Sequence, residues 1–232
     1  MKRAAFFFLL FFCIEGLHAQ SASEIVSVLK SKLDAVKDYE AVGKLKTDVA
    51  FLKIPISNVR IYYKYPDLLR IKKDGGISVL PKGGIRISMN SLITEGKYTA
   101  ISAGRTNWKG TDLAMIKLVP DGESSDIVIT TLYVDDKLML IRKTITTTKD
   151  NGTYEMEMEY GKYAKWGLPD KAVMIFSTKD YKLPKGITFE YEASIANKNK
   201  STDPPSKQGR VEIIYASYLI NKGLNSEVFA TN

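Results

Sequence analysis

Three carboxylates on one strand-like segment are the residues in this sequence that come closest to a catalytic pattern. Glu155, Glu157 and Glu159 are spaced two apart, and paired carboxylates are the groups that hydrolyse glycosidic bonds. The residues between and beside them are Tyr154, Met156, Met158 and Tyr160. Alternate residues of a strand point to opposite faces, so the carboxylates share one face and the apolar residues the other. The pattern favours a solvated outer row over a catalytic pair, and we do not expect an enzyme.

Histidine and cysteine, which many catalytic mechanisms need, occur only at the start of the sequence. His18 and Cys13 are the single histidine and cysteine of the 232-residue chain. Both fall within residues 1–20, where a basic pair precedes an apolar run at 4–14, a pattern typical of a cleavable signal peptide. Cleavage near residue 20 would leave an exported, soluble chain without a thiol or an imidazole. Disulfides, zinc sites built from those groups and Ser-His-Asp triads are then ruled out, and no cofactor or metal is expected.

The charge of the chain points away from nucleic acid. The formal net charge is +8, but the lysines are dispersed and no dense run of basic and aromatic residues occurs, so we expect no nucleic-acid partner. For an exported protein, attraction to anionic lipid surfaces explains the net positive charge better than binding to nucleic acid does.

One helix opens the predicted mature chain. Ser21 and Glu24 have the spacing of a capping box, in which each side chain accepts a hydrogen bond from the other's backbone N–H. Ile25, Leu29 and Leu33 then recur at helical spacing, which predicts an amphipathic helix to about residue 37. The apolar side of this helix must pack against other apolar residues of the chain or against a ligand.

The rest of the chain alternates with a period of two, which predicts strands. The expected strands are 39–51, 59–65, 68–72, 76–80, 98–103, 111–119, 127–134, 138–147, 153–160, 173–178, 187–195 and 210–220. So many antiparallel strands avoid bare edges by curving toward closure. We predict a mainly β fold: an incomplete antiparallel β-barrel of about eleven strands, forming a single domain over residues 21–232. Residues 88–93 are predicted as a short lid helix, and 196–208 as a solvated loop.

The inner faces of such a barrel are candidates for binding something apolar, because eight strands already enclose space for a small ligand. The predicted cavity-lining residues are Ile25, Leu29, Leu33, Leu45, Ile61, Tyr63, Ile71, Tyr154, Met156, Met158, Tyr191 and Ile213. The alternative is that the helix fills the barrel as ordinary core, and periodicity alone does not separate a lid from a plug.

A set of features recurs in a fixed order and spacing: the signal peptide ending Ala19-Gln20, the opening helix, and the segments 59–71, 80–82, 118–120, 132–135, 159–163, 167–169 and 218–229. In this order and spacing the sequence resembles the LolA-like outer-membrane lipoprotein carriers of Bacteroidetes-type bacteria. The resemblance covers nearly the whole mature chain. No single segment is diagnostic.

The resemblance implies a half-barrel lidded by helices and a periplasmic carrier that shelters lipoprotein acyl chains and shuttles them between the inner and outer membranes. The implied partners are an acylated lipoprotein or lipid, an inner-membrane lipoprotein-releasing transporter and an outer-membrane acceptor. A monomer is expected. The alternative within the same superfamily is a lipid- or lipoprotein-binding sensor that does not transport.

One position departs from the family. The family carries an arginine that helps to hold the lid just before the proline of a Lys-x-Pro segment, and this sequence has Tyr65 there. No lid latch is therefore assigned.

Overall fold

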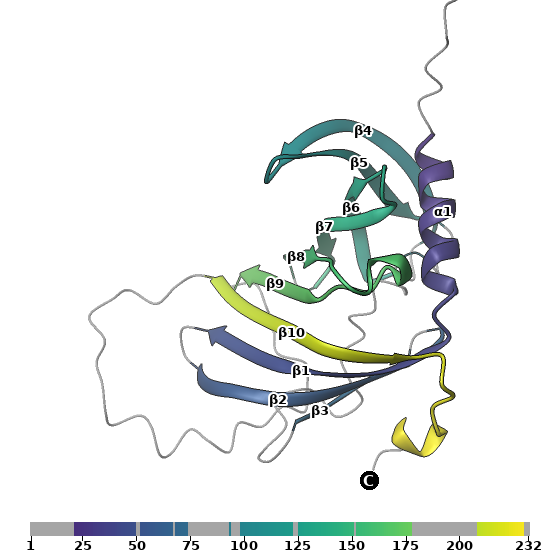
Figure 1. Ribbon diagram of the computed structural model, residues 1–232. Coiled ribbons are helices and arrows are strands. Elements are labelled where there is room, and N and C mark those ends of the chain that lie inside the picture. The colour runs from purple at the N-terminus through teal and green to yellow at the C-terminus, as the bar shows by residue number, and fades with distance from the viewer. Residues whose placement is uncertain are drawn as a thin grey trace, which may run out of the picture.

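The described part of the computed structural model comprises residues 21–49, 52–66, 68–73, 93, 98–122, 125–150, 152–177 and 208–229. Figure 1 shows these residues as a curved sheet with one α-helix beside it. The elements are α1 (Ala22–Asp34), β1 (Asp38–Val49), β2 (Leu52–Lys64), β3 (Leu68–Lys73), β4 (Tyr98–Trp108), β5 (Thr111–Pro120), β6 (Ile127–Asp135), β7 (Leu140–Thr148), β8 (Thr153–Glu159), η1 (Ala164–Trp166), β9 (Lys171–Ser177), β10 (Gln208–Ile220) and η2 (Ser226–Phe229), where η marks a 3₁₀ turn.

All ten described strands belong to one antiparallel sheet, in the order β3-β2-β1-β10-β9-β8-β7-β6-β5-β4. Strands that follow each other in sequence are neighbours in the sheet, except β3 and β4. In the interior of the sheet β1, the first strand, pairs with β10, the last described strand. The outermost described strands, β3 and β4, do not pair with each other. The predicted incomplete antiparallel barrel with an N-terminal helix is thus confirmed as an open, curved sheet.

The helix begins as the sequence predicts. The Ser21 hydroxyl accepts a hydrogen bond from the Glu24 N–H at 3.2 Å, and the Glu24 carboxylate accepts one from the Ser21 N–H at 2.7 Å. This capping box satisfies two backbone donors that a helix leaves unpaired at its start. Ile25, Leu29 and Leu33 are all buried, so the predicted apolar side is the side that packs.

Most predicted strands recur within a few residues of their expected ends. β2 and β4 are longer than predicted, since β2 begins at Leu52 and β4 continues to Trp108. The strands predicted at 76–80 and 187–195 and the signal peptide lie outside the described residues. The loop predicted at 196–208 also lies outside them except for Gln208, which begins β10. The predicted lid helix at 88–93 also lies outside them except for Ile93, which is buried.

Two hydrophobic cores lie on the same face of the sheet. The helix-side core packs α1 against β5 to β8 and contains Ala22, Ile25, Val26, Leu29, Leu33, Ile93, Ala114, Ile116, Leu118, Leu132, Val134, Ile141 and Met158. The tyrosine-side core lies over β1, β2 and β10 and contains Val36, Ala41, Leu45, Val59, Ile61, Tyr63, Leu168 and Tyr218. We call this the helix face of the sheet and the opposite one the outer face. No helix in the described ranges is long and apolar enough to cross a membrane.

Candidate functional site

A pocket with a cavity volume of about 80 Å³, partly open to solvent, lies where the two cores meet. Leu33 and Met158 of the helix-side core line it, and so do Val36, Tyr63 and Tyr218 of the tyrosine-side core. The remaining lining residues are Tyr39, Leu69, Met156, Gly167, Leu168, Pro169, Ala172 and Tyr215. The pocket is therefore bounded by the end of α1, the strands β1, β2, β3, β8, β9 and β10, and the turn after η1.

A glycine brings the end of α1 against this turn. Gly167 ends η1 with φ +67°, a left-handed conformation that side-chain-bearing residues rarely adopt. A Cβ at this position would lie 3.3 Å from Cδ2 of Leu33, so the glycine also allows the helix to approach closely. Leu168 and Pro169 come directly after it and form one wall of the pocket.

Asp170 anchors the end of this wall to the sheet. Its N–H donates to the Glu159 carbonyl and its own carbonyl accepts from the Tyr215 N–H, both at 2.8 Å. Its carboxylate accepts a hydrogen bond from the Lys162 N–H at 3.2 Å. The loop between β8 and β9 is thereby held at both ends, and the position of the pocket wall is fixed by backbone contacts.

Tyrosine rings form the opposite side of the pocket. Tyr39 stacks on Tyr63 with centroids 5.2 Å apart and meets Tyr218 edge-on at 5.3 Å. Tyr215 stacks on Tyr218 at 5.0 Å, and Tyr163 meets Tyr218 edge-on at 4.8 Å. Contacts of these geometries stabilise aromatic pairs beyond the area that they bury, so the rings form a rigid surface.

Two of the tyrosine hydroxyls donate hydrogen bonds to backbone carbonyls of the protein. The Tyr63 hydroxyl donates to the Pro66 carbonyl at 3.0 Å, and the Tyr218 hydroxyl donates to the Pro169 carbonyl at 2.7 Å. Burial raises the pKa of Tyr215 to about 12, opposed by a hydrogen bond with Tyr218. Burial likewise raises the pKa of Tyr39 and Tyr218 well above their usual range. Tyr39, Tyr215 and Tyr218 are therefore neutral at physiological pH.

The lining of the pocket is suited to an apolar group. Its described lining contains no charged side chain and no serine or threonine, and its polar side-chain atoms are tyrosine hydroxyls. Within the described residues no three His, Cys, Asp or Glu side chains are grouped as metal ligands would be. A lining of aliphatic, thioether and aromatic side chains with a few hydroxyls is suited to a hydrocarbon chain with a small polar end.

The predicted cavity-lining residues are distributed over three environments. Leu33, Tyr63, Met156 and Met158 line the pocket. Ile25 and Leu29 lie in the helix-side core, Leu45 and Ile61 are in the tyrosine-side core, and Ile71 and Ile213 pack against the latter. Tyr154 is half-buried on the same face of β8 as Met156 but is not among the residues that line the pocket. Tyr191 lies outside the described residues.

The remaining lining residues were not in the predicted lining set. Tyr39 and Tyr215 face inward by the same alternation as Tyr63, and the alternation also indicated both as inward-facing. Leu168 and Pro169 lie in a loop, where no periodicity indicates which side chain points inward. Their position depends on the contact between Gly167 and Leu33, which joins residues far apart in the chain.

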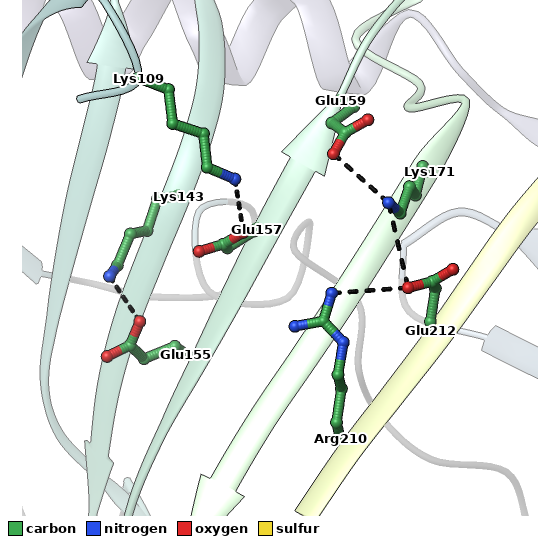
Figure 2. A network of polar contacts seen from close by, with 8 residues as sticks. All are labelled: Lys109, Lys143, Glu155, Glu157, Glu159, Lys171, Arg210 and Glu212. Carbon is green, nitrogen blue, oxygen red and sulfur yellow. Dashed lines mark hydrogen bonds and ion pairs between the residues drawn. The ribbon is translucent and has the colours of Figure 1, made fainter. Parts of the chain in front are cut away.

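The three glutamates of β8 lie on the outer face, as predicted, and each has a cationic partner. Figure 2 shows Glu155 paired with Lys143, Glu157 with Lys109 and Glu159 with Lys171. Lys171 also approaches Glu212 of β10, which Arg210 contacts at 3.5 Å. Four carboxylates and four cations thus form a charge-balanced network across β7 to β10, with Lys109 reaching it from the turn between β4 and β5.

Tyr65, at the position of the family's arginine, contacts the segment that comes after α1. Its N–H donates to the Lys37 carbonyl at 2.8 Å, and the Lys37 ammonium lies 4.7 Å from the centre of its ring. The ring is partly exposed, so this contact joins the turn after β2 to the start of β1 at the surface.

The open antiparallel sheet with its N-terminal helix is similar in overall fold to several solved structures. A LolA superfamily protein from Nitrosomonas europaea has a TM-score of 0.56 and 11% sequence identity, over 92% of this chain and 99% of that one. A DUF1329 family protein from Desulfovibrio piger has a TM-score of 0.53 and 11% identity, over 91% and 98% of the two chains. An outer-membrane lipoprotein-sorting protein domain from Vibrio parahaemolyticus has a TM-score of 0.50 and 13% identity, over 89% and 94%.

These likenesses show that the chain has a LolA-like fold. No protein-family model matches the sequence, and no curated protein matches it. At such low identity the shared feature is the fold, which alone does not establish a function.

Proposed function

We propose that the protein is a periplasmic carrier that holds the acyl chains of lipoproteins in the pocket between α1 and the sheet. The observation that carries this proposal is the lining, in which apolar and aromatic side chains surround an open-mouthed space without a charged group. The LolA-like fold and the predicted signal peptide support the same function. A carrier needs no covalent chemistry, so binding in the pocket is sufficient.

The physical basis is the cost of exposing hydrocarbon to water. Each buried methylene contributes about 0.8 kcal/mol, so a long acyl chain is held strongly by an apolar surface even without polar contacts. Met156 adds adaptability, since methionine can pack against apolar groups of different shapes. The tyrosine rings add flat aromatic surface against which an acyl chain can pack.

Shuttling requires a donor and an acceptor. We propose an inner-membrane lipoprotein-releasing transporter and an outer-membrane acceptor as these partners, with the carrier acting as a monomer between them. The second candidate is a sensor that binds lipid or lipoprotein in the same pocket. It differs from the carrier in keeping its ligand instead of delivering it to a second membrane.

The first experiment is mass spectrometry, native and denaturing, of the mature protein purified from its own periplasm. Acylated lipoprotein bound at unit stoichiometry is the expected result and would identify the cargo. A free lipid alone would shift the proposal toward a lipid carrier or sensor. A protein that is empty, and that takes up no lipoprotein in vitro, would contradict the proposal and favour a pocket closed by ordinary core packing.

Transport is tested separately from binding. Protein loaded with a lipoprotein is mixed with outer-membrane vesicles, and the lipoprotein that reaches the vesicles is measured. Transfer at a rate above spontaneous release supports the carrier, whereas stable retention supports the sensor. Met156→Leu is the matched control for variants of the pocket, because the exchange conserves volume and apolarity.

A further inference from the structure

The outer face of β10, β1, β2 and β3 differs in charge from the outer face of the neighbouring strands. Over β7 to β10 the cations and carboxylates are matched and paired (Figure 2). On β1, β2 and β3 the outer-face positions include Lys44, Arg60 and Lys72, all exposed. Glu40 is a neighbouring carboxylate on this face and contacts Arg60 at 3.2 Å. These three cations outnumber Glu40, since the other carboxylates on this face of β1 and β10, Asp38, Asp48 and Glu212, lie opposite further cations, Lys64, Arg210 and Lys46, in the sheet register.

Aliphatic side chains are exposed among these cations. Val42, Ile214 and Leu219 are 40%, 47% and 58% exposed. In the sheet register Ile214 pairs with Lys44, Leu219 pairs with Glu40, and Arg60 pairs with Val42 on one side and with Lys72 on the other. We call these six residues, Val42, Lys44, Arg60, Lys72, Ile214 and Leu219, the basic outer patch.

Single exposed aliphatic residues need no explanation, but their grouping with lysine and arginine at paired positions of a sheet does. Lysine and arginine attract anionic headgroups, and their methylene stems extend along apolar surface while their charges stay in water. Valine, isoleucine and leucine between them can enter the boundary between headgroups and acyl chains.

We propose that the basic outer patch docks the protein onto an anionic phospholipid bilayer. The choice of a bilayer over an acidic protein rests on the proposed function, because an acyl cargo enters from and returns to a membrane. The strands that carry the patch also carry Tyr39, Tyr63, Leu69, Tyr215 and Tyr218 of the pocket on their helix face. A docked protein therefore holds its pocket about one sheet thickness, roughly 10 Å, from the lipid surface.

The test measures binding of the mature protein to phosphatidylcholine vesicles with and without phosphatidylglycerol, by co-sedimentation at low and high salt. We expect binding only with phosphatidylglycerol and weakening by salt, because screening reduces attraction between exposed charges. The double variant Lys44→Glu, Lys72→Glu is expected to bind at least about thirtyfold more weakly. The double variant Ile214→Ser, Leu219→Ser tests the aliphatic contribution and is expected to bind about tenfold more weakly.

The matched control is Lys117→Glu with Lys162→Glu, two exposed lysines on β5 and in the loop after β8 that give the same change in net charge. It should bind phosphatidylglycerol vesicles within about threefold of the wild type. If the patch and control variants weaken binding equally, net charge alone acts and the patch proposal is overturned. Wild-type protein that binds a soluble acidic protein but no vesicle would overturn it in favour of a protein partner.

Two further measurements separate this proposal from the proposed function. Acyl-ligand binding by the Lys44→Glu, Lys72→Glu variant should equal that of the wild type, which also shows that the variant is folded. Vesicle binding by Met156→Glu, a pocket variant, should be unchanged. Wild-type protein that binds phosphatidylglycerol vesicles but no acyl ligand would contradict the carrier alone. Wild-type protein that binds acyl ligand but does not prefer phosphatidylglycerol vesicles would contradict the patch alone.

Discussion

Met156 and Met158 lie two residues apart on the helix face of β8, but their surroundings differ. Both line the pocket, but Met158 is 1% exposed and belongs to the helix-side core, whereas Met156 is half-buried and lies outside that core. A carboxylate at position 158 would be buried among the apolar side chains of this core. A carboxylate at position 156 can remain partly hydrated at the pocket surface.

We therefore expect Met156→Glu to weaken binding of a fluorescent acyl ligand by at least about tenfold while leaving the protein folded. Met158→Glu is expected to lower the free energy of unfolding by about 3 kcal/mol or more, measured by urea denaturation. Wild-type affinity in Met156→Glu, with Met156→Leu as the control, would show that acyl chains bind elsewhere.

The buried tyrosines make the protein sensitive to alkali. Burial raises the pKa of Tyr215 from 10.0 to about 12, so the unfolded chain loses this proton first as the pH rises. The stabilisation is complete below pH 10 and is lost as the pH approaches 12. Tyr39 and Tyr218 shift in the same direction for the same reason.

We expect the free energy of unfolding to fall between pH 10 and pH 12, in step with tyrosinate absorbance. Tyr215→Phe should be less stable than the wild type at neutral pH, because it lacks the hydrogen bond with Tyr218, and should lose less stability over this pH range. Equal slopes in the two proteins would show that Tyr215 titrates normally in the folded state.

At the scale of elements, Asn221 ties the end of α1 to the start of β1 and the end of β10. Its amide nitrogen donates to the Ala35 carbonyl at 2.9 Å, and its amide oxygen accepts from the Lys37 and Asp38 N–H groups at 2.7 and 3.3 Å. The residue has φ +55°, a conformation that asparagine tolerates better than most residues. Leu33 and Val36 of the pocket lie beside this junction.

Asn221→Ala is expected to lower the free energy of unfolding by about 2 to 4 kcal/mol, since it loses these hydrogen bonds and keeps a Cβ at positive φ. Asn221→Gly loses the same hydrogen bonds but removes the cost of a Cβ at positive φ, so it should lower the free energy of unfolding by about 1 to 2 kcal/mol. Urea denaturation of both variants measures the difference. If Asn221→Ala, which keeps a Cβ at positive φ, is as stable as the wild type, the side-chain bonds contribute nothing and the strands alone fix the junction.

Gly43 marks an irregularity in the pairing of β1 with β10. The register shifts between Val42 and Gly43, and a Cβ on Gly43 would lie 2.5 Å from the Ile214 carbonyl oxygen. Because that atom belongs to the backbone, a larger residue would force the two strands apart. We expect Gly43→Ala to lower the melting temperature and to cost about 1 to 3 kcal/mol. Val42→Ala, next to it on the exposed side, should change stability by less than about 0.5 kcal/mol.

Local patterns predicted these elements well and their junctions poorly. The capping box, the apolar side of α1 and the alternation on β8 each depend on residues within a few positions of one another, and the structure reproduces all three. The pocket depends on Gly167 against Leu33 and on Tyr218 against Tyr39 and Tyr163, contacts that no periodicity contains. Hence a predicted apolar face contained pocket residues such as Met156 together with core residues such as Ile61.

At the scale of the whole molecule, the pocket is the place where two separate cores approach each other. α1 contributes Leu33 from one core and the segment after it contributes Val36 from the other. A ligand seated between them contacts both cores at once. Its binding free energy should therefore stabilise the sheet as a unit and not one half alone.

A ligand that binds only the folded state adds about 2.7 kcal/mol to the free energy of unfolding at a concentration one hundred times its Kd. We expect acyl ligand at this level to raise stability by that amount in the wild type and by much less in Met156→Glu. Hydrogen exchange should slow together in α1, in β8 and in β1 and β2, because the contacts of the ligand span both cores. Slowing confined to β1 and β2 would mean that the tyrosine-side core alone holds the ligand, and that α1 covers the sheet without taking part in binding.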